Sequence, residues 1–392
     1  MWMYCSIAAN LGILGLFKYF NFFSQTAARI AEILGMDGTP LLLEIALPAG
    51  LSFYTFQSMA YTLDVYRGTI KPVRNFRDFA LFVSFFPQLM AGPIERASKL
   101  LPQLLRERKI TPEGIREGVW LFYWGCFKKL YIADSLIPMS SRVADPLDEK
   151  HYLLAVLAFS FRIYCDFSGY SDMAVGIAKM LGVRLTRNFR VPFLSSDPGE
   201  FWRRWHISLS TWFRDYVYGP MRDPIGRNMA LLITMVLIGF WHGAAWQFIL
   251  FGAAWGIVLV IHRNLAPHIA TVAARGPFFL FVTKYGGIVL TFSIWLLIGI
   301  LFISSDFNNA VEAWTTIFTD FTPTVSTWKS LALILFYSWP IIAMDIAMYV
   351  TGDQDCVRKL AYPWRLLIYT VMAFLLLSKG SYDAQEFIYF RF

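Results

Sequence analysis

Seven stretches of this chain are apolar over nearly the length that a helix needs to cross the hydrocarbon of a bilayer, about 20 residues. Because hydrocarbon offers no water to backbone N–H and C=O groups, such stretches fold as helices. The sequence therefore predicts an all-α polytopic membrane protein and, without internal repeats or long linkers, a single membrane domain over residues 1–392. The stretches are Trp2–Phe23, Leu41–Tyr61, Gly118–Met139, Tyr152–Leu181, Phe278–Ile303, Leu331–Val350 and Trp364–Leu377.

The composition also favours a membrane protein over a soluble one. Hydrophobic residues make up 57% of the chain and charged residues only 16%, whereas soluble domains carry about 25% charged residues. The first stretch has neither a basic leader nor a small-residue cleavage site, so we expect a retained helix rather than a signal peptide. The four cysteines are scattered, which argues against a disulfide framework and against a bound metal.

The charges predict the orientation of the loops. Lys and Arg accumulate in cytoplasmic loops, so we expect Lys179–Arg227 and Thr62–Arg77, both basic, to be cytoplasmic. Ser304–Trp328 has three acidic residues and no Lys or Arg, so we expect it outside. In a chain this apolar, basic loops favour membrane lipid headgroups or a phosphorylated cosubstrate as partners, and no nucleic acid.

One apolar stretch, Asn228–His262, is interrupted by the motif Phe240-Trp241-His242-Gly243. Its 35 residues are too many for one straight span and too few for two comfortable ones, so we expect two short helices or a re-entrant hairpin, bent near His242. An ionisable side chain at membrane depth often marks a functional site, and an imidazole can take and return a proton near neutral pH. The alternative is a histidine that donates to a neighbouring carbonyl and holds a broken helix together.

The longest polar region, Gly182–Arg227, lies in the middle of the chain. Aromatic residues recur there at helical spacing, which predicts an interfacial amphipathic helix that starts at Pro198 and is capped by Ser195, Ser196 or Asp197. Its apolar face would hold Phe201, Trp205, Leu209 and Trp212. In the alternative interpretation, His206 and three arginines face a substrate tunnel; the arginines are Arg203, Arg204 and Arg214.

Tyr152–Leu181 carries three charged residues, Arg162, Asp166 and Asp172. Arg162 and Asp166 share a helix face at a spacing of four residues, which predicts either a buried pair that fixes helix packing or the lining of a polar cavity. The other histidines fall at segment ends or in loops and are expected to be solvated; they are His151, His262 and His268.

The motifs of soluble enzymes are missing from the sequence. There is no HExxH, no P-loop, no GxGxxG after a strand, no GxSxG and no EF-hand loop. A lipid or polysaccharide transporter would also place ionisable residues at mid-membrane, and the lack of paired inverted halves weakens that alternative without excluding it.

Several sequence blocks follow one another along nearly the whole chain: Ser52–Gln57 with Tyr61–Arg67, Phe86–Ile94, Tyr164–Asp172, Asn188-Phe189 with Pro192-Phe193, Glu200–Tyr218, Gly239–Ala244 and the aromatic tail Phe387–Phe392. Together they resemble the membrane-bound O-acyltransferases, in particular the bacterial branch that contains the alginate O-acetyltransferase membrane protein. Relatives usually begin with further membrane helices, so we expect this chain to be truncated or a short variant.

The resemblance implies a many-helix fold with a funnel or tunnel that meets at the histidine of the Trp-His-Gly motif, His242, as the catalytic residue. It makes His206 the second residue associated with activity. No permanently bound cofactor is expected, and the cosubstrate would be acetyl-CoA or another acyl thioester. Arg203, Arg204 and Arg214 could attract its phosphates, although anchoring to lipid headgroups explains these arginines about as well.

The expected function is transfer of an acetyl group in the bacterial cytoplasmic (inner) membrane. The acceptor would be an exported polysaccharide such as alginate, or an extracytoplasmic acetyl-carrier protein. Transfer of D-alanyl groups to teichoic acid is the alternative within the same reaction class.

Overall fold

The computed structural model describes residues 2–89, 92–140, 151–320, 322–381 and 387–388, and every regular element in these ranges is a helix. This confirms the all-α prediction. The α-helices are α1 (Trp2–Leu14), α2 (Phe20–Ile33), α3 (Leu51–Tyr66), α4 (Phe76–Val83), α5 (Phe86–Leu89), α6 (Ala97–Leu105), α7 (Pro112–Phe127), α8 (Ile137–Ser140), α9 (Tyr152–Met180), α10 (Pro198–Arg204), α11 (Ile207–Phe213), α12 (Gly219–Ile225), α13 (Arg227–His242), α14 (Trp246–Ala273), α15 (Pro277–Ile303), α16 (Phe307–Thr319), α17 (Val325–Thr351) and α18 (Tyr362–Lys379). Within the described ranges these helices are joined by the π-helical segments η1 (Gly15–Tyr19), η2 (Lys128–Ala133) and η6 (Arg214–Tyr218) and by the short 3₁₀ segments η3 (Asp134–Leu136), η5 (Pro192–Leu194) and η7 (Cys356–Lys359).

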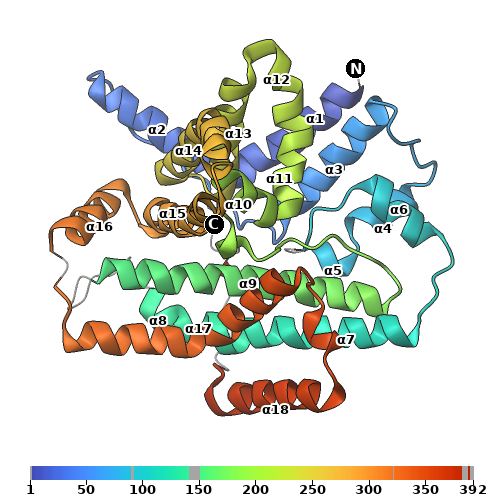
Figure 1. The fold of residues 1–392 in the computed structure, drawn as a ribbon. Helices are drawn as coiled ribbons and strands as arrows, with labels where there is room; N and C mark the ends of the chain where they lie inside the picture. The colour runs from blue at the N-terminus through green and yellow to red at the C-terminus, as the bar shows by residue number, and fades with distance from the viewer. Residues whose placement is uncertain (1, 90–91, 141–150, 321, 382–386, 389–392) are drawn as a thin grey trace.

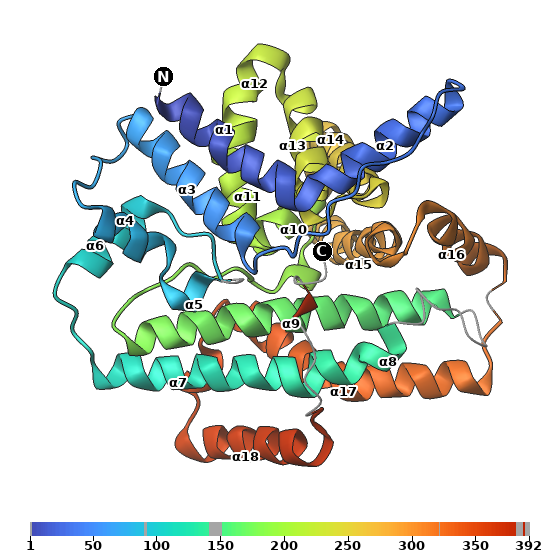
Figure 2. The ribbon, with the colours of Figure 1, turned by 180° about the vertical axis from the view of Figure 1, so that it is seen from behind.

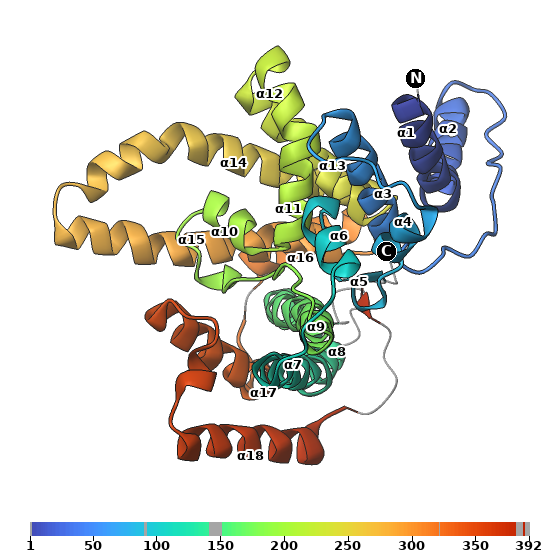
Figure 3. The ribbon, with the colours of Figure 1, turned by 90° about the vertical axis from the view of Figure 1, so that its right-hand side faces the viewer.

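The helices form two groups on either side of α9. Helices α7, α9 and α17 lie side by side, with α18 along the outer side of this layer (Figure 1). Helices α1, α3, α11 and α13 lie on the other side of α9, as the view from behind also shows (Figure 2). Helices α14 and α15 form a long hairpin that extends away from this core (Figure 3). The polar region between α9 and α13 holds α10, α11 and α12, which lie on the same side of α9 as α1, α3 and α13 (Figure 1).

Within the described residues, five helices are long and apolar enough to cross a membrane: Trp2–Ile33, Tyr152–Met180, Trp246–Ala273, Pro277–Ile303 and Val325–Thr351. The first joins α1, η1 and α2. The predicted stretch Leu41–Tyr61 is helical only from Leu51, because Pro48 lacks an N–H and Gly50 takes a left-handed φ of 76°. The C-terminal stretch lies in α18, which is helical but is not one of the five.

Helices α7 and α9 pack so closely that only glycine fits at their contact. A Cβ on Gly125 would lie 2.5 Å from the carbonyl oxygen of Gly169, and a Cβ on Gly118 would lie 2.5 Å from that of Gly176. The pairs are seven residues apart on both helices, so they fall on one face of each. Small residues of this kind let membrane helices approach until their backbones touch.

Two lysines from η2, the buried Lys128 and the half-buried Lys129, neutralise acidic residues of this layer. Lys128 binds Asp172 at 2.7 Å, and Lys129 binds both Asp134 and Asp166 at 2.8 Å. Paired charges are the form in which an apolar interior tolerates ionised groups. Asp166 therefore takes part in a buried ion pair, but its partner is a lysine of a neighbouring segment. Asp172, for which no pairing was predicted, also lines a small cavity.

Arg162 differs from its predicted arrangement. Its Nη1 donates to Ser140 Oγ at 3.0 Å, while Asp166 also accepts from the backbone N–H of Ile388 at 2.8 Å. The pair predicted at a spacing of four residues was wrong because long-range partners compete with neighbours on the same helix.

The interrupted stretch breaks where the motif predicted. Helix α13 ends at His242, Gly243 is extended, and α14 starts at Trp246. The second helix is not short, however: it has 28 residues and includes His262 and His268, which were predicted to lie in loops or at segment ends. Gly239 allows the tight turn, since a Cβ there would lie 2.1 Å from the carbonyl oxygen of Phe248.

The single amphipathic helix predicted over 199–218 is divided. Asp197 caps α10 by accepting from the N–H of Glu200 at 2.7 Å, and Pro198 occupies the first turn, as predicted. The helix ends at Arg204, Trp205 is extended, and His206 takes a left-handed φ of 42° before α11 begins. The four residues of the predicted apolar face, Phe201, Trp205, Leu209 and Trp212, are buried in the protein core instead of facing lipid.

Candidate functional site

His242 occupies the last position of α13, directly at the break. Its side chain is only 4% exposed. Aromatic rings enclose the imidazole: Trp241 with ring centroids 5.0 Å apart, Phe302 at 5.2 Å and Phe251 at 6.3 Å. The broken helix therefore presents the imidazole in an apolar environment, where general-base chemistry is shielded from bulk water.

His206 also contacts Trp241. Its ring centroid is 5.8 Å from that of Trp241 and 4.5 Å from that of Phe167, and the side chain has no exposed surface. The two histidines are 36 residues apart in the sequence, yet one indole contacts both imidazoles. The structure thus brings together the two residues that the sequence singled out.

A buried polar network fixes the strained backbone at His206. The carbonyl of Asn188 accepts from Ile207 N at 2.9 Å, and its side-chain oxygen accepts from Ser208 N at 3.1 Å. The amide of Asn188 donates to Ser171 Oγ at 3.1 Å. A left-handed non-glycine residue persists only where its surroundings hold it in place. Asn188 and Ser208 belong to this site, although sequence reasoning assigned them no role.

The end of the described chain reaches the same region. Phe387 packs against Phe167 and Tyr170, with centroids 5.9 and 5.1 Å apart, and Phe167 in turn contacts His206. The rest of the aromatic tail, residues 389–392, and residues 90–91 of the block Phe86–Ile94 lie outside the described residues.

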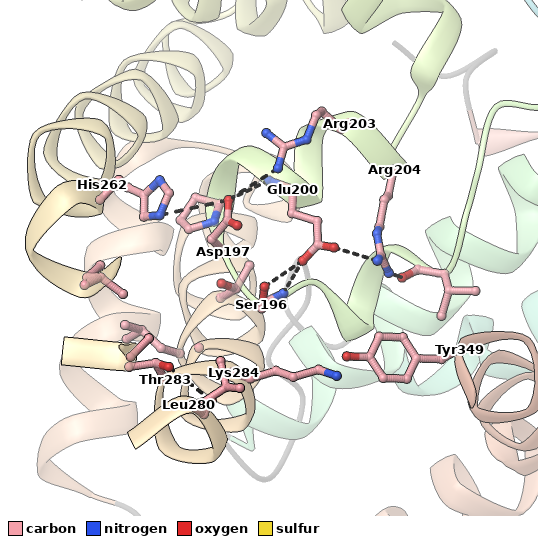
Figure 4. Close-up of a pocket in the computed structure, with 18 of the residues that line it drawn as sticks. Ser196, Asp197, Glu200, Arg203, Arg204, His262, Leu280, Thr283, Lys284 and Tyr349 are labelled. Atoms are coloured by element: carbon pink, nitrogen blue, oxygen red, sulfur yellow. Dashed lines mark hydrogen bonds and ion pairs between the residues drawn. The ribbon is translucent and has the colours of Figure 1, made fainter. Parts of the chain in front are cut away.

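A second feature is a cavity of about 1170 Å³ between α10, the distal half of α14, the proximal half of α15 and the end of α17. Arg203 and Arg204 line it, as do Arg190, His262, Lys284 and Tyr349 (Figure 4). Arg214 does not: it lies in η6, is largely exposed and pairs with Asp215 at 2.8 Å. The three arginines proposed from the sequence therefore separate into two places.

The charges of this cavity are partly neutralised by its own acids. Glu200 accepts from Arg204 at 2.6 Å, and Asp197 lies 3.9 Å from Arg203 and 4.0 Å from His262. Tyr349 lies between two cations, with Lys284 Nζ 5.3 Å and the guanidinium carbon of Arg204 5.8 Å from its ring centroid. The lining of the cavity thus combines basic and aromatic side chains with apolar ones such as Ile269 and Leu280.

Helix α10 connects the cavity to the histidines. Glu200, Arg203 and Arg204 face the cavity, whereas Phe201 and Trp202 are buried on its other face, and His206 follows within two residues of its end. Neither His206 nor His242 lines the cavity itself. Sequence reasoning missed His262, Lys284 and Tyr349 because they come from helices remote in sequence, with no local motif that marks them.

No group of three or more His, Cys, Asp or Glu side chains in the described residues could hold a metal ion.

Residues 73–306 match the family model described as MBOAT, membrane-bound O-acyltransferase family, and both histidines lie within this range. The chain is 43% identical over 271 residues to the probable alginate O-acetylase AlgI of Azotobacter vinelandii, covering 67% of this chain and 54% of that protein. It is 34% identical to the peptidoglycan O-acetyltransferase of Helicobacter pylori, over 67% of this chain and 55% of that protein. It is 30% identical to the teichoic acid D-alanyltransferase of Streptococcus thermophilus, over 58% of this chain and 59% of that protein.

The chain thus spans about half the length of the curated relatives it matches. With the family model covering more than half of its residues, this polytopic membrane protein belongs to the membrane-bound O-acyltransferase family.

Proposed function

We propose that this protein is an O-acyltransferase that passes an acetyl group from a cytosolic thioester, acetyl-CoA, to a hydroxyl group of an exported polysaccharide or of an extracytoplasmic carrier protein. The proposed location is the bacterial cytoplasmic membrane. The observation that carries the proposal is His242, held at the helix break in an aromatic enclosure and linked to His206 through Trp241.

The reaction assigns His242 the role of general base. The acceptor oxygen attacks the thioester carbonyl carbon while the imidazole removes the hydroxyl proton. The new C–O ester bond forms, the C–S bond breaks, and the proton passes from the imidazolium to the leaving thiolate, so the histidine is regenerated. His206 orients this centre or contacts the acyl donor, from its place beside Trp241.

The cavity supports a role in donor binding. Arg203, Arg204 and Lys284 supply cations for phosphates, and Tyr349 offers an aromatic face. Arg204 would have to exchange Glu200 for the ligand. Lipid headgroups carry the same phosphate chemistry, so a contact with the membrane surface remains the alternative for these residues. Arg214 lies outside the cavity, and its position does not support this role.

Acetyl is favoured over D-alanyl as the transferred group because the acetyl-transferring relatives are the more similar ones, at 43% and 34% identity against 30%. Alginate is favoured over peptidoglycan as the acceptor class on the same ground. A transporter would move the polysaccharide without forming an ester.

The purified full chain, given acetyl-labelled acetyl-CoA and an alginate oligosaccharide in detergent, should form labelled ester on the oligosaccharide. His242→Ala should lower kcat by about 100- to 10,000-fold, the contribution typical of general acid-base catalysis. His268→Ala, an exposed histidine of α14, is the matched control and should retain wild-type kcat. If the His242→Ala protein is active, His242 is not the general base. If transfer occurs only from a D-alanyl carrier thioester, that thioester and not acetyl-CoA is the donor.

A further inference from the structure

The end of α13 has an unusual set of hydrogen-bond donors. The last carbonyls of a helix have no partner within the helix itself. Here three consecutive ones accept from side chains of the first membrane helix: Phe240 O from Tyr19 Oη at 3.3 Å, Trp241 O from Lys18 Nζ at 2.7 Å, and His242 O from Lys18 Nζ at 3.3 Å. Lys18, more than 220 positions away in the sequence, thus binds both peptide carbonyls that flank the Cα of His242, and its neighbour Tyr19 binds the carbonyl before them.

Lys18 and Tyr19 belong to η1, the π-helical segment between α1 and α2. Single π-turns inside α-helices are often found at functional sites. The aromatic contacts fix the same alignment, since Tyr19 stacks on Phe240 with centroids 4.3 Å apart and Lys18 Nζ lies 5.7 Å from the ring centroid of Trp241. The irregular turn therefore meets the helix break that carries the histidine.

The positive charge of Lys18 also suits its place beside the free carbonyls at the C-terminal end of α13. A lysine inside an apolar span is unfavourable unless it has a partner. Among the described residues, the polar and ring contacts of Lys18 are those with the carbonyls of Trp241 and His242 and with the Trp241 ring, and no carboxylate pairs with it. A cation at the C-terminal end of a helix is stabilised by the partial negative charge of the free carbonyls.

We propose that Lys18 is a positioning residue for His242. By binding the carbonyls on both sides of its Cα, the ammonium group fixes the backbone from which the imidazole projects, and so keeps the ring in its reactive orientation. This inference rests on the proposed role of His242. It assigns a part in the reaction to a residue of the N-terminal helix, which lies outside the matched family region, residues 73–306.

The test compares Lys18→Met, which keeps the length of the side chain and loses its donors, with Lys18→Arg, which keeps a cation and donors. The matched control is Asn21→Ala, from the same helical segment, whose side chain exchanges two hydrogen bonds with Leu43 and none with α13. In the acetyl-transfer assay, Lys18→Met should lower kcat by on the order of 10- to 100-fold, with the KM for acetyl-CoA unchanged. Lys18→Arg should restore most of kcat, and Asn21→Ala should match wild type.

Amide hydrogen exchange separates this inference from the proposed function. Lys18→Met should speed exchange over residues 240–246 relative to wild type and to Asn21→Ala, whether or not acetyl transfer is the reaction. If wild type forms no ester, the proposed function is overturned and exchange alone decides whether Lys18 holds the break. Unchanged kcat and unchanged exchange in Lys18→Met would refute the positioning role, as would an equal loss of kcat in Lys18→Arg.

Discussion

At the scale of single residues, the site depends on side chains that fix two irregular points of the backbone. His206 has a left-handed φ of 42°, held by the network of Asn188, and His242 ends α13, held by Lys18. A left-handed non-glycine residue costs about 1 to 3 kcal/mol, so this conformation persists only if several contacts with neighbouring residues hold it in place. Both candidate catalytic residues therefore sit where the chain leaves regular structure.

Asn188 provides a test of this strain. Asn188→Leu keeps the branched shape of the side chain but removes both side-chain hydrogen bonds, leaving the N–H of Ser208 buried without its acceptor. An unsatisfied buried donor costs about 1 to 3 kcal/mol, so the thermal unfolding midpoint in detergent should fall by several degrees, together with kcat. Asn308→Leu, at an exposed site, is the control. Equal midpoints for the two variants would show that the network does not hold His206.

The sequence predicts such residues only in part. His242 was identifiable because an ionisable residue interrupts an apolar stretch, and the cap of α10 because Asp197 precedes Pro198. The left-handed turn at His206 was not, because the aromatic spacing on both sides continues through it as if one helix were present. Tertiary hydrogen bonds from Asn188 determine that turn, and the local pattern does not contain them.

At the scale of elements, the contact between α7 and α9 supports the site. Helix α9 carries Phe167 and Ser171, which contact His206 and Asn188, and its close approach to α7 depends on paired glycines. The break between α13 and α14 depends in the same way on Gly239. Sequence reasoning identified these helices but not their partners, because glycine spacing does not say which helix will be approached.

Gly125→Leu tests the close contact between α7 and α9. The new side chain would start 2.5 Å from the carbonyl oxygen of Gly169, so α7 and α9 must separate. Overpacking of this kind typically costs about 1 to 3 kcal/mol, and more is expected here because backbone blocks the site. We predict a lower unfolding midpoint and loss of transfer. Gly286→Leu, where no atom lies within 4 Å of the Cβ position, is the control and should leave both unchanged. A stable, active Gly125→Leu protein contradicts the tight packing.

At the scale of the whole molecule, charged residues tie together segments remote in sequence at one end of the bundle. Glu117 of α7 accepts from Lys179 at the end of α9 and from Arg358 of η7 at 2.7 Å. In Figure 1 this end is the side where α7 begins and α9 ends. The cavity likewise assembles four helices, which is why most of its lining could not be predicted from the sequence.

The hydrogen bond from Lys179 is the largest cause that lowers the pKa of Glu117 from its ordinary 4.5 to about 2. A carboxyl whose pKa is lower in the folded state stabilises the fold above its unfolded pKa, and this contribution is lost as the pH falls from about 4.5 to 2. Glu117→Gln should therefore have a lower unfolding midpoint than wild type at pH 7, and the difference should shrink as the pH falls below 4.5. A difference independent of pH would show that this carboxylate does not stabilise the fold through its charge.

The central claim, that a cytosolic thioester and an acceptor hydroxyl meet at His242, is tested most directly with the two substrates on opposite sides of a membrane. Proteoliposomes enclose the alginate oligosaccharide, and labelled acetyl-CoA is added outside. We predict that labelled ester accumulates on the enclosed oligosaccharide with the wild-type protein and falls to the level of empty liposomes with His242→Ala. Ester formation that persists in His242→Ala, or that requires both substrates on the same side, would contradict the account.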